Sequence, residues 1–262
     1  MSLFKKLAFT MVEVLIVLGV IGIVAAITLP NLITNIEKQK NLSILKKAYA
    51  EISNHLKMFD YEYGCDGDLR QCAPGHFSFV DKFVHYLYTK QHFGSPIDVK
   101  GYKWYLTTST SDITSGSNPV IADPNYASDK NNSGGRSYLL SSRGGEYYIY
   151  IGPYMYDNWY SINAKKYGYF RARIFIYTNP KHISICKSIC NDADRSRARV
   201  KDGLEMFELF ITDTERIIPQ GFSECGNHYY CKSLTSDNCS SETKNYTACL
   251  QKIIQDGWKI NY

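Results

Sequence analysis

The feature that most constrains this chain is an apolar run near its N-terminus, from Met11 to Leu29, which contains a single charge at Glu13. Lys5 and Lys6 are the only charged residues before the run. At about 1.5 Å per helical residue the run reaches roughly 28 Å, close to the ~30 Å hydrocarbon core of a bilayer. It therefore predicts one membrane-spanning helix, with the two lysines on the cytoplasmic side and everything after Pro30 outside.

Glu13 requires an explanation, because a carboxylate at full membrane depth costs about 2.5 to 3.5 kcal/mol on insertion scales. One explanation is a capping box, in which Thr10 begins the helix and Glu13 reaches back to it. An alternative for the whole run is a secretory signal peptide, because Val24-Ala25-Ala26 places small residues after an apolar core. The internal acid and the full spanning length argue against that alternative.

The string KKLAFTMVEVLIVLGVIGIVAAITLP, residues 5 to 30, resembles the N-terminus of type IV prepilins and type II secretion pseudopilins. The resemblance implies that a prepilin peptidase cuts between Ala8 and Phe9 and methylates the new amine of Phe9. Ala8 stands where the family most often has Gly. This specific match covers about the first thirty residues and not the rest of the chain.

The same resemblance implies roles for three residues of the run. The new amine is expected to pair with Glu13 of a neighbouring subunit and so to set the axial register of subunits in a filament. Gly22 and Pro30 mark a segment that tends to lose helix in such filaments. Proline removes a backbone hydrogen bond, and small residues let neighbouring helices approach closely.

After Pro30 the chain is expected to stay helical to about Phe59, because apolar residues recur every three or four positions. The residues of this stripe are Leu42, Leu45, Tyr49, Ile52 and Leu56. A helix with one such stripe is expected to pack on the sheet of a globular head. A coiled-coil dimer is the alternative, although the stripe lasts only about two heptads.

Beyond Gly64 the chain is rich in Gly, Ser, Asn and Tyr, which predicts a β-rich head with surface loops. Strands are predicted at Glu146 to Ile151, Arg171 to Tyr177 and Met206 to Ile211, the last two as antiparallel neighbours. A short helix from Thr247 to Gln255 is expected to end at a glycine cap, Gly257. The stretches 207–221 and 249–260 resemble, more weakly, pilin-like proteins with cysteine-bearing C-termini.

The predicted fold is therefore α+β and pilin-like, with a long N-terminal helix packed on an antiparallel β-sheet head that has disulfide-closed loops. It divides into a cleaved leader (1–8), a transmembrane or filament-core helix (9–30), an amphipathic continuation (31–60) and the head (61–262).

The eight cysteines are an even set within the predicted head, which favours disulfides formed in an oxidising compartment. Local spacing suggests the pairs Cys65 with Cys72, Cys186 with Cys190, Cys225 with Cys231, and Cys239 with Cys249, although eight cysteines allow 105 connectivities. A zinc site is the alternative, because His182 and His228 lie near cysteines. No second cysteine pair repeats a zinc spacing, so no metal is predicted.

Motifs for enzymatic chemistry are absent from the sequence: it has no Gly-x-Ser-x-Gly, no phosphate-binding glycine loop and no His-Glu-x-x-His. We therefore expect no enzyme activity and no cofactor. His85 and His92 are placed to share a helix face, but isolated histidines are more often not ligands. Asp192, Asp194 and Asp202 are candidate calcium ligands whose spacing fits no EF-hand loop.

The 22 tyrosines are dense at 147–150 and 154–160. The favoured interpretation is that they suit half-buried strands, and the alternative is a sticky or glycan-binding surface. The net charge of +5 is scattered, which indicates no sequence-specific nucleic-acid binding.

Together these patterns predict a structural subunit of a type IV pilus-like or type II secretion pseudopilus filament. It is expected as a single-pass protein of the bacterial inner membrane that later enters a periplasmic or cell-surface filament. The implied partners are other pilin or pseudopilin subunits, the prepilin peptidase/methyltransferase, the inner-membrane assembly platform and membrane lipid. Alternatives are a minor tip or priming subunit with an adhesive or DNA-uptake role and, from another class, a signal-anchored envelope binding protein or enzyme.

Overall fold

The computed structural model describes residues 10–94, 97–98, 102–105, 138–153, 170–180, 184–187, 205–214, 217–219 and 249–261. The chain divides into two compact units, Met1–Lys40 and Asn41–Tyr262. The predicted leader and cleavage residues Lys5, Lys6, Ala8 and Phe9 lie outside the described residues.

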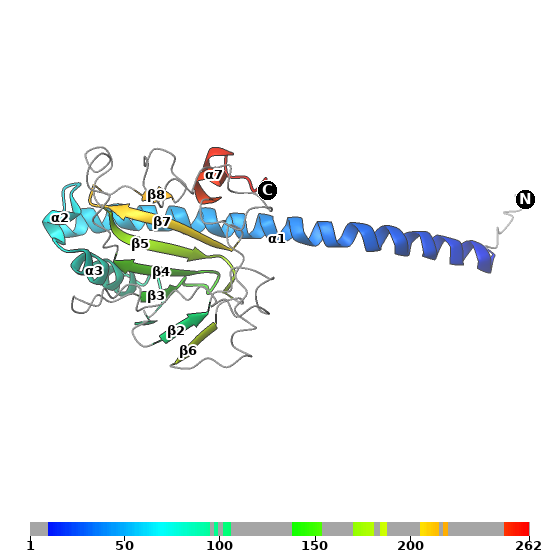
Figure 1. Cartoon of the computed structure of the whole chain (residues 1–262), viewed down its shortest axis with the longest axis horizontal. Helices are drawn as coiled ribbons and strands as arrows, with labels where there is room; N and C mark the ends of the chain where they lie inside the picture. The colour runs from blue at the N-terminus through cyan, green and yellow to red at the C-terminus, as the bar shows by residue number, and fades with distance from the viewer. Residues whose placement is uncertain are drawn as a thin grey trace, which may run out of the picture. The chain divides into compact units, whose positions relative to one another are not determined.

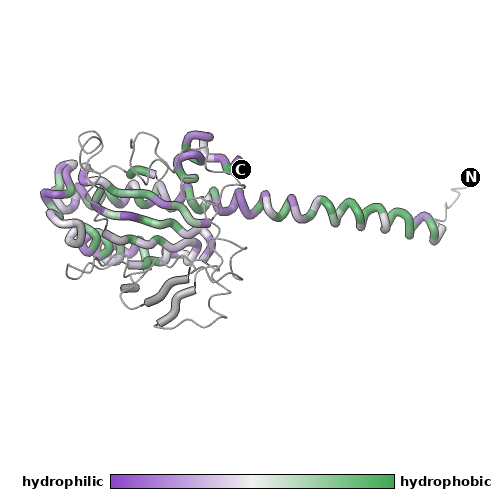
Figure 2. Tube along the Cα trace, viewed as in Figure 1, coloured by the Kyte–Doolittle hydropathy of each residue, from purple (hydrophilic) through white to green (hydrophobic). Residues whose placement is uncertain are grey.

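Helix α1 spans Met11–Tyr63 and is continuous through Pro30. Figure 2 shows that its N-terminal part is apolar along most of its length. Two threonine hydroxyls donate to carbonyl oxygens one turn earlier, from Thr28 to Val24 at 2.9 Å and from Thr34 to Pro30 at 3.0 Å. The long N-terminal helix is thus confirmed, while the loosening implied around Pro30 in a filament stays a prediction.

The apolar stripe of α1 after residue 40 belongs to the core of the second unit. Leu42, Leu45, Ile52 and Leu56 are buried as predicted, and Tyr49 packs against the core while partly buried. Because this stripe is covered within the chain, it is not left open for the coiled-coil alternative.

The main sheet has six strands in the order β1-β3-β4-β5-β7-β8, and every neighbouring pair is antiparallel (Figure 1). The strands are β1 Ile97–Asp98, β3 Tyr138–Ser141, β4 Tyr148–Pro153, β5 Phe170–Tyr177, β7 Met206–Thr212 and β8 Ile217–Pro219. A separate antiparallel pair is formed by β2 Tyr102–Tyr105 and β6 Ser184–Lys187. The three predicted strands correspond to β4, β5 and β7, and the predicted pairing of β5 with β7 is confirmed.

Alternation along the strands explains how the sheet joins the core. In β5, Ala172, Ile174 and Ile176 are buried and belong to the same apolar cluster as the α1 stripe. Leu209 of β7 pairs with Ile174 and joins this cluster. Residues two apart on a strand share a face, so one face of the sheet packs against helices.

Two helices follow α1 where the sequence suggested only a β-rich head. They are α2, Leu69–Cys72, and α3, His76–Thr89. Phe79, Phe83 and Leu87 of α3 are buried in the core, each four residues after the last. The apolar residues of α3 therefore have the spacing of one helix face in the sequence, although the polar residues around them obscure that pattern.

The C-terminal helix α7 spans Cys249–Gln255 and ends at the predicted glycine cap. Gly257 has φ +68°, its N–H donates to Ile254 at 3.1 Å, and the N–H of Trp258 donates to Ile253 at 2.7 Å. This left-handed turn places the Trp258 ring against Tyr49 of α1, with ring centroids 5.4 Å apart.

The disulfide between Cys65 and Cys72 is formed as predicted. Cys249 is also disulfide-bonded. Cys186 lies in β6, and the remaining cysteines of the predicted pairs (Cys190, Cys225, Cys231 and Cys239) lie outside the described residues.

Candidate functional site

The N-terminal part of α1 is the most unusual surface of the chain. Its large apolar side chains from Met11 to Ile36 are 45 to 82% exposed. The helix is long and apolar enough to cross a membrane, and none of its most apolar 18-residue window is buried. Apolar surface of this extent is stable only when lipid or other apolar helices cover it.

Glu13 closes a capping box with Thr10 at the start of this helix. Its Oε2 accepts hydrogen bonds from the backbone N–H and the hydroxyl of Thr10, both at 2.8 Å. In return, the N–H of Glu13 donates to the Thr10 hydroxyl at 3.3 Å. The capping explanation of Glu13 is therefore confirmed, and the pairing implied with a neighbouring subunit stays a prediction.

Gly19 and Gly22 lie on this helix with open space around them. A Cβ added at either position would meet no atom within 4 Å. Glycine in a helix interior costs about 1 kcal/mol relative to alanine. No close contact with another described residue accounts for either glycine.

The prediction that His85 and His92 are placed to share a helix face is wrong. His85 is exposed on α3, whereas His92 follows the end of that helix and stacks on His55 of α1, with ring centroids 3.8 Å apart. Burial, with a smaller contribution from His92, lowers the pKa of His55 to about 4. The sequence signal for His55 was its place on the buried stripe, between Ile52 and Phe59.

Around the histidine pair lies a polar hollow of about 300 Å³ between α1, the turn after α3 and the β3–β4 hairpin. Lys47 pairs with Glu146, and the hydroxyl of Tyr147 donates to Glu51. These contacts hold the hairpin to α1. Among the described residues, no group of three or more His, Cys, Asp or Glu side chains is placed to hold a metal ion.

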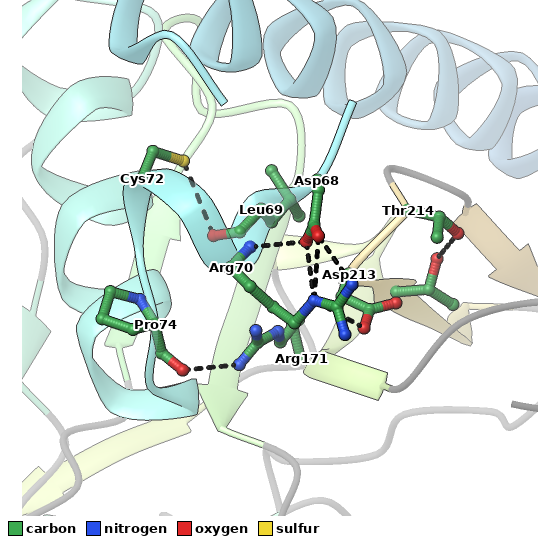
Figure 3. A network of polar contacts seen from close by, with 9 residues as sticks. Asp68, Leu69, Arg70, Cys72, Pro74, Arg171, Asp213 and Thr214 are labelled. Carbon is green, nitrogen blue, oxygen red and sulfur yellow. Dashed lines mark hydrogen bonds and ion pairs between the residues drawn. The ribbon is translucent and has the colours of Figure 1, made fainter. Parts of the chain in front are cut away.

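A second polar network fixes the disulfide loop to the start of β5 and to the turn after β7 (Figure 3). Asp68 accepts hydrogen bonds from the backbone N–H and the Nε of Arg70, at 2.9 and 2.8 Å, and the Arg70 side chain lowers the pKa of Asp68. The N–H of Leu69 donates to the carbonyl of Asp213 at 2.8 Å, and Arg171 donates to the carbonyl of Pro74 at 3.1 Å. The network ties α2 to β5 and to the turn after β7, so it supports the fold.

The tyrosine-rich segment at 147–150 belongs to the sheet and its core. Tyr147 and Tyr150 are buried, and Tyr148 is half-buried. The interpretation of these tyrosines as strand residues is thereby confirmed. Residues 154–160 and the candidate calcium ligands Asp192, Asp194 and Asp202 lie outside the described residues.

Comparison of the chain with models of protein families, with curated proteins and with solved structures found no significant match. A function for this protein is therefore inferred from its own residues.

Proposed function

We propose that this chain is a structural subunit of a type IV pilus-like or type II secretion pseudopilus filament, inserted in a bacterial inner membrane and cut between Ala8 and Phe9. The observation that carries this proposal is the exposed apolar surface of α1 from Met11 to Ile36, which begins at a single acid, Glu13. Lipid covers that surface in the precursor, and sister helices cover it in the filament.

Cleavage supplies the second charge that assembly needs. It removes Lys5 and Lys6, which hold the N-terminus at the cytoplasmic face, and creates an amine at Phe9. A helix without those lysines leaves lipid more easily. A carboxylate that enters an apolar filament core is stable there only with a partner, and the amine of a neighbouring subunit is that partner.

The cap and the proposed ion pair can use the same carboxylate. Both bonds from Thr10 go to Oε2 of Glu13, and Oε1 accepts no hydrogen bond from any residue in the described part of the chain. The cap holds the side chain at the helix start, and the second oxygen can accept from the neighbour's amine.

Two substitutions separate the cap from the charge. Glu13→Gln keeps an acceptor oxygen for the cap but removes the charge, whereas Thr10→Ala removes the hydroxyl and keeps the charge. We expect Glu13→Gln to enter sheared filaments about tenfold less than the unchanged protein, equivalent to ~1.4 kcal/mol. Thr10→Ala is expected to assemble nearly normally.

Glu37→Gln is the matched control, because Glu37 is an exposed acid further along α1. It should assemble like the unchanged protein, and membrane insertion of all three variants should be unaffected. Normal assembly of Glu13→Gln combined with failure of Thr10→Ala would reduce Glu13 to a helix cap.

The N-terminus of the protein extracted from membranes tests the processing step by intact mass and N-terminal sequencing. A chain that starts at Phe9 with a methylated amine supports the proposal. A start at Met1 indicates a plain membrane anchor, and a start at Ile27 indicates a secreted protein. The amount in sheared filaments then separates a major subunit from the minor tip or priming alternative.

A further inference from the structure

Three segments of the second unit meet at His55. It lies on α1, and it faces the turn at residues 90–94 after α3 and the β3–β4 hairpin across the polar hollow. The residues that line the hollow are Lys47, Glu51, His55, Gln91, His92, Ser142, Arg143 and Gly144. The hollow brings solvent to the edge of the histidine pair.

The His55 ring is enclosed by aromatic rings and has an unpaired nitrogen. His55 is 9% exposed, and its buried Nδ1 has no hydrogen-bond partner among the residues that the structure describes. His92 stacks on it with 31° between the ring planes, and Phe93 meets it edge-on, with centroids 6.3 Å apart. This enclosed site favours a neutral imidazole over a charged one, because burial removes the water that stabilises the charge.

The turn that carries His92 is held in an unfavourable backbone conformation. Gln91 has φ +58°, a left-handed value that costs free energy for a residue with a side chain. Its N–H donates to Tyr88 at 2.9 Å, and the N–H of His92 donates to Leu87 at 3.1 Å. This is the Schellman pattern that ends a helix, with glutamine where glycine is usual.

The charged groups around the pair are already engaged in other contacts. Glu51 accepts from the Tyr147 hydroxyl, and Glu146 is paired with Lys47. Arg143 on the hairpin adds a second cation to the hollow, and Tyr86 of α3 meets the His92 ring with centroids 6.1 Å apart. A proton on His55 would therefore place a positive charge in an enclosed site whose hollow also contains the cation Arg143.

We propose that the stacked pair of His55 and His92 is an acid-sensitive latch between α1 and the turn at residues 90–94. At neutral pH the uncharged His55 ring packs on His92 and holds the strained turn in place. Acid charges the His55 ring, the enclosed charge lacks water, and the turn leaves α1 while the sheet stays folded. Release also frees Gln91 from its left-handed conformation.

The lowered pKa of His55 sets the direction and size of the effect. Its value in the closed state is about 4 against 6.5 for a free imidazole, so the open state binds more protons at pH values between these two. The latch is therefore fully stable above pH 6.5 and weakens as the pH falls toward 4. For His55 alone, the opening equilibrium constant rises about twentyfold between pH 7 and pH 5.

Hydrogen exchange on the full chain in detergent micelles tests the latch. The amides of His92, Phe93 and Gly94 donate to backbone carbonyls, so their protection factors report opening of the turn. After correction for intrinsic exchange, these factors should fall about twentyfold from pH 7 to pH 5. Amides in the β5–β7 ladder should keep their protection over the same range.

His55→Phe and His92→Phe keep an aromatic ring at each position and cannot take up a proton. His55→Phe should nearly abolish the pH dependence of the turn, whereas His92→Phe keeps His55 and should retain most of it. His85→Gln, at the exposed histidine of α3, should behave like the unchanged protein. The latch would be overturned if protection of the turn did not change with pH or fell equally in the two Phe variants. Loss of that protection together with protection of the β5–β7 ladder would also overturn it.

Discussion

The pair formed by Arg173 of β5 and Glu208 of β7 allows the cost of a buried charge to be predicted. Glu208 is 2% exposed, and its Oε1 accepts a hydrogen bond from the Arg173 Nε. Its buried Oε2 has no hydrogen-bond partner in the described part of the chain, and burial raises the pKa of this carboxyl while Arg173 opposes the rise. The Arg173 guanidinium also lies over the Phe175 ring, 4.4 Å from its centroid.

Arg173→Met keeps most of the side-chain stem and leaves Glu208 without its cation. The penalty is limited by protonation, because a carboxyl that cannot remain charged takes up a proton instead. From the ordinary pKa of 4.5, protonation costs about 3 kcal/mol at pH 7 and under about 1 kcal/mol at pH 5. The variant should therefore lose about 3 kcal/mol of unfolding free energy at pH 7 and much less at pH 5.

Urea unfolding of the full chain in micelles, followed by tryptophan fluorescence, measures these values; Trp258, packed on Tyr49, is one of the three tryptophans that report. Adding Glu208→Gln to Arg173→Met should restore most of the loss at pH 7, because no buried charge remains. Lys57→Met, at an exposed cation of α1, is the control and should change stability by less than about 0.5 kcal/mol. An equal loss for Arg173→Met at both pH values would refute the reasoning.

Two further predictions concern the packing of the head. Replacing Cys65 and Cys72 together with serine should lower the unfolding free energy by about 2.5 kcal/mol, since the bridge closes a short loop with a sequence separation of 7. Denaturant titration of the oxidised proteins checks this, and an unchanged unfolding free energy in the serine variant would contradict it. Phe59→Ala should lower the unfolding free energy by about 3 to 5 kcal/mol, because Phe59 is fully buried. Tyr61→Ala, at a residue that is 90% exposed, should leave the unfolding free energy nearly unchanged. Equal melting temperatures for the two variants would contradict the packing described for α1.

Local patterns predicted several elements of this fold. The three-and-four spacing of Leu42, Leu45 and Ile52 predicted the buried face of α1, and each of these residues is buried. Gly257 was expected to end the last helix because only a residue without a side chain enters the left-handed turn at no cost, and its φ is +68°. Helix α3 was not predicted, although its apolar residues have helical spacing, because the Gly, Ser, Asn and Tyr content beyond Gly64 indicated a β-rich head with surface loops.

Contacts between distant residues were not predicted. Nothing near His55 in the sequence indicates His92, because the pair depends on how the turn after α3 meets α1. From the sequence alone, Glu208 resembles an ordinary surface acid. Only the register of β5 and β7 places it beside Arg173. Such pairs follow from strand register and helix packing, which short sequence windows do not contain.

The N-terminal helix was determined by sequence alone, because its length, its apolar character and the three-residue spacing of Thr10 and Glu13 are properties of neighbouring residues. The fold decided which polar groups of the head are buried and which partners they have, since burial depends on segments far apart in the chain. A hydrogen bond across one helical turn follows from local geometry, whereas the stacking of His55 on His92 and the pairing of Arg173 with Glu208 exist only once the helices and the sheet have packed.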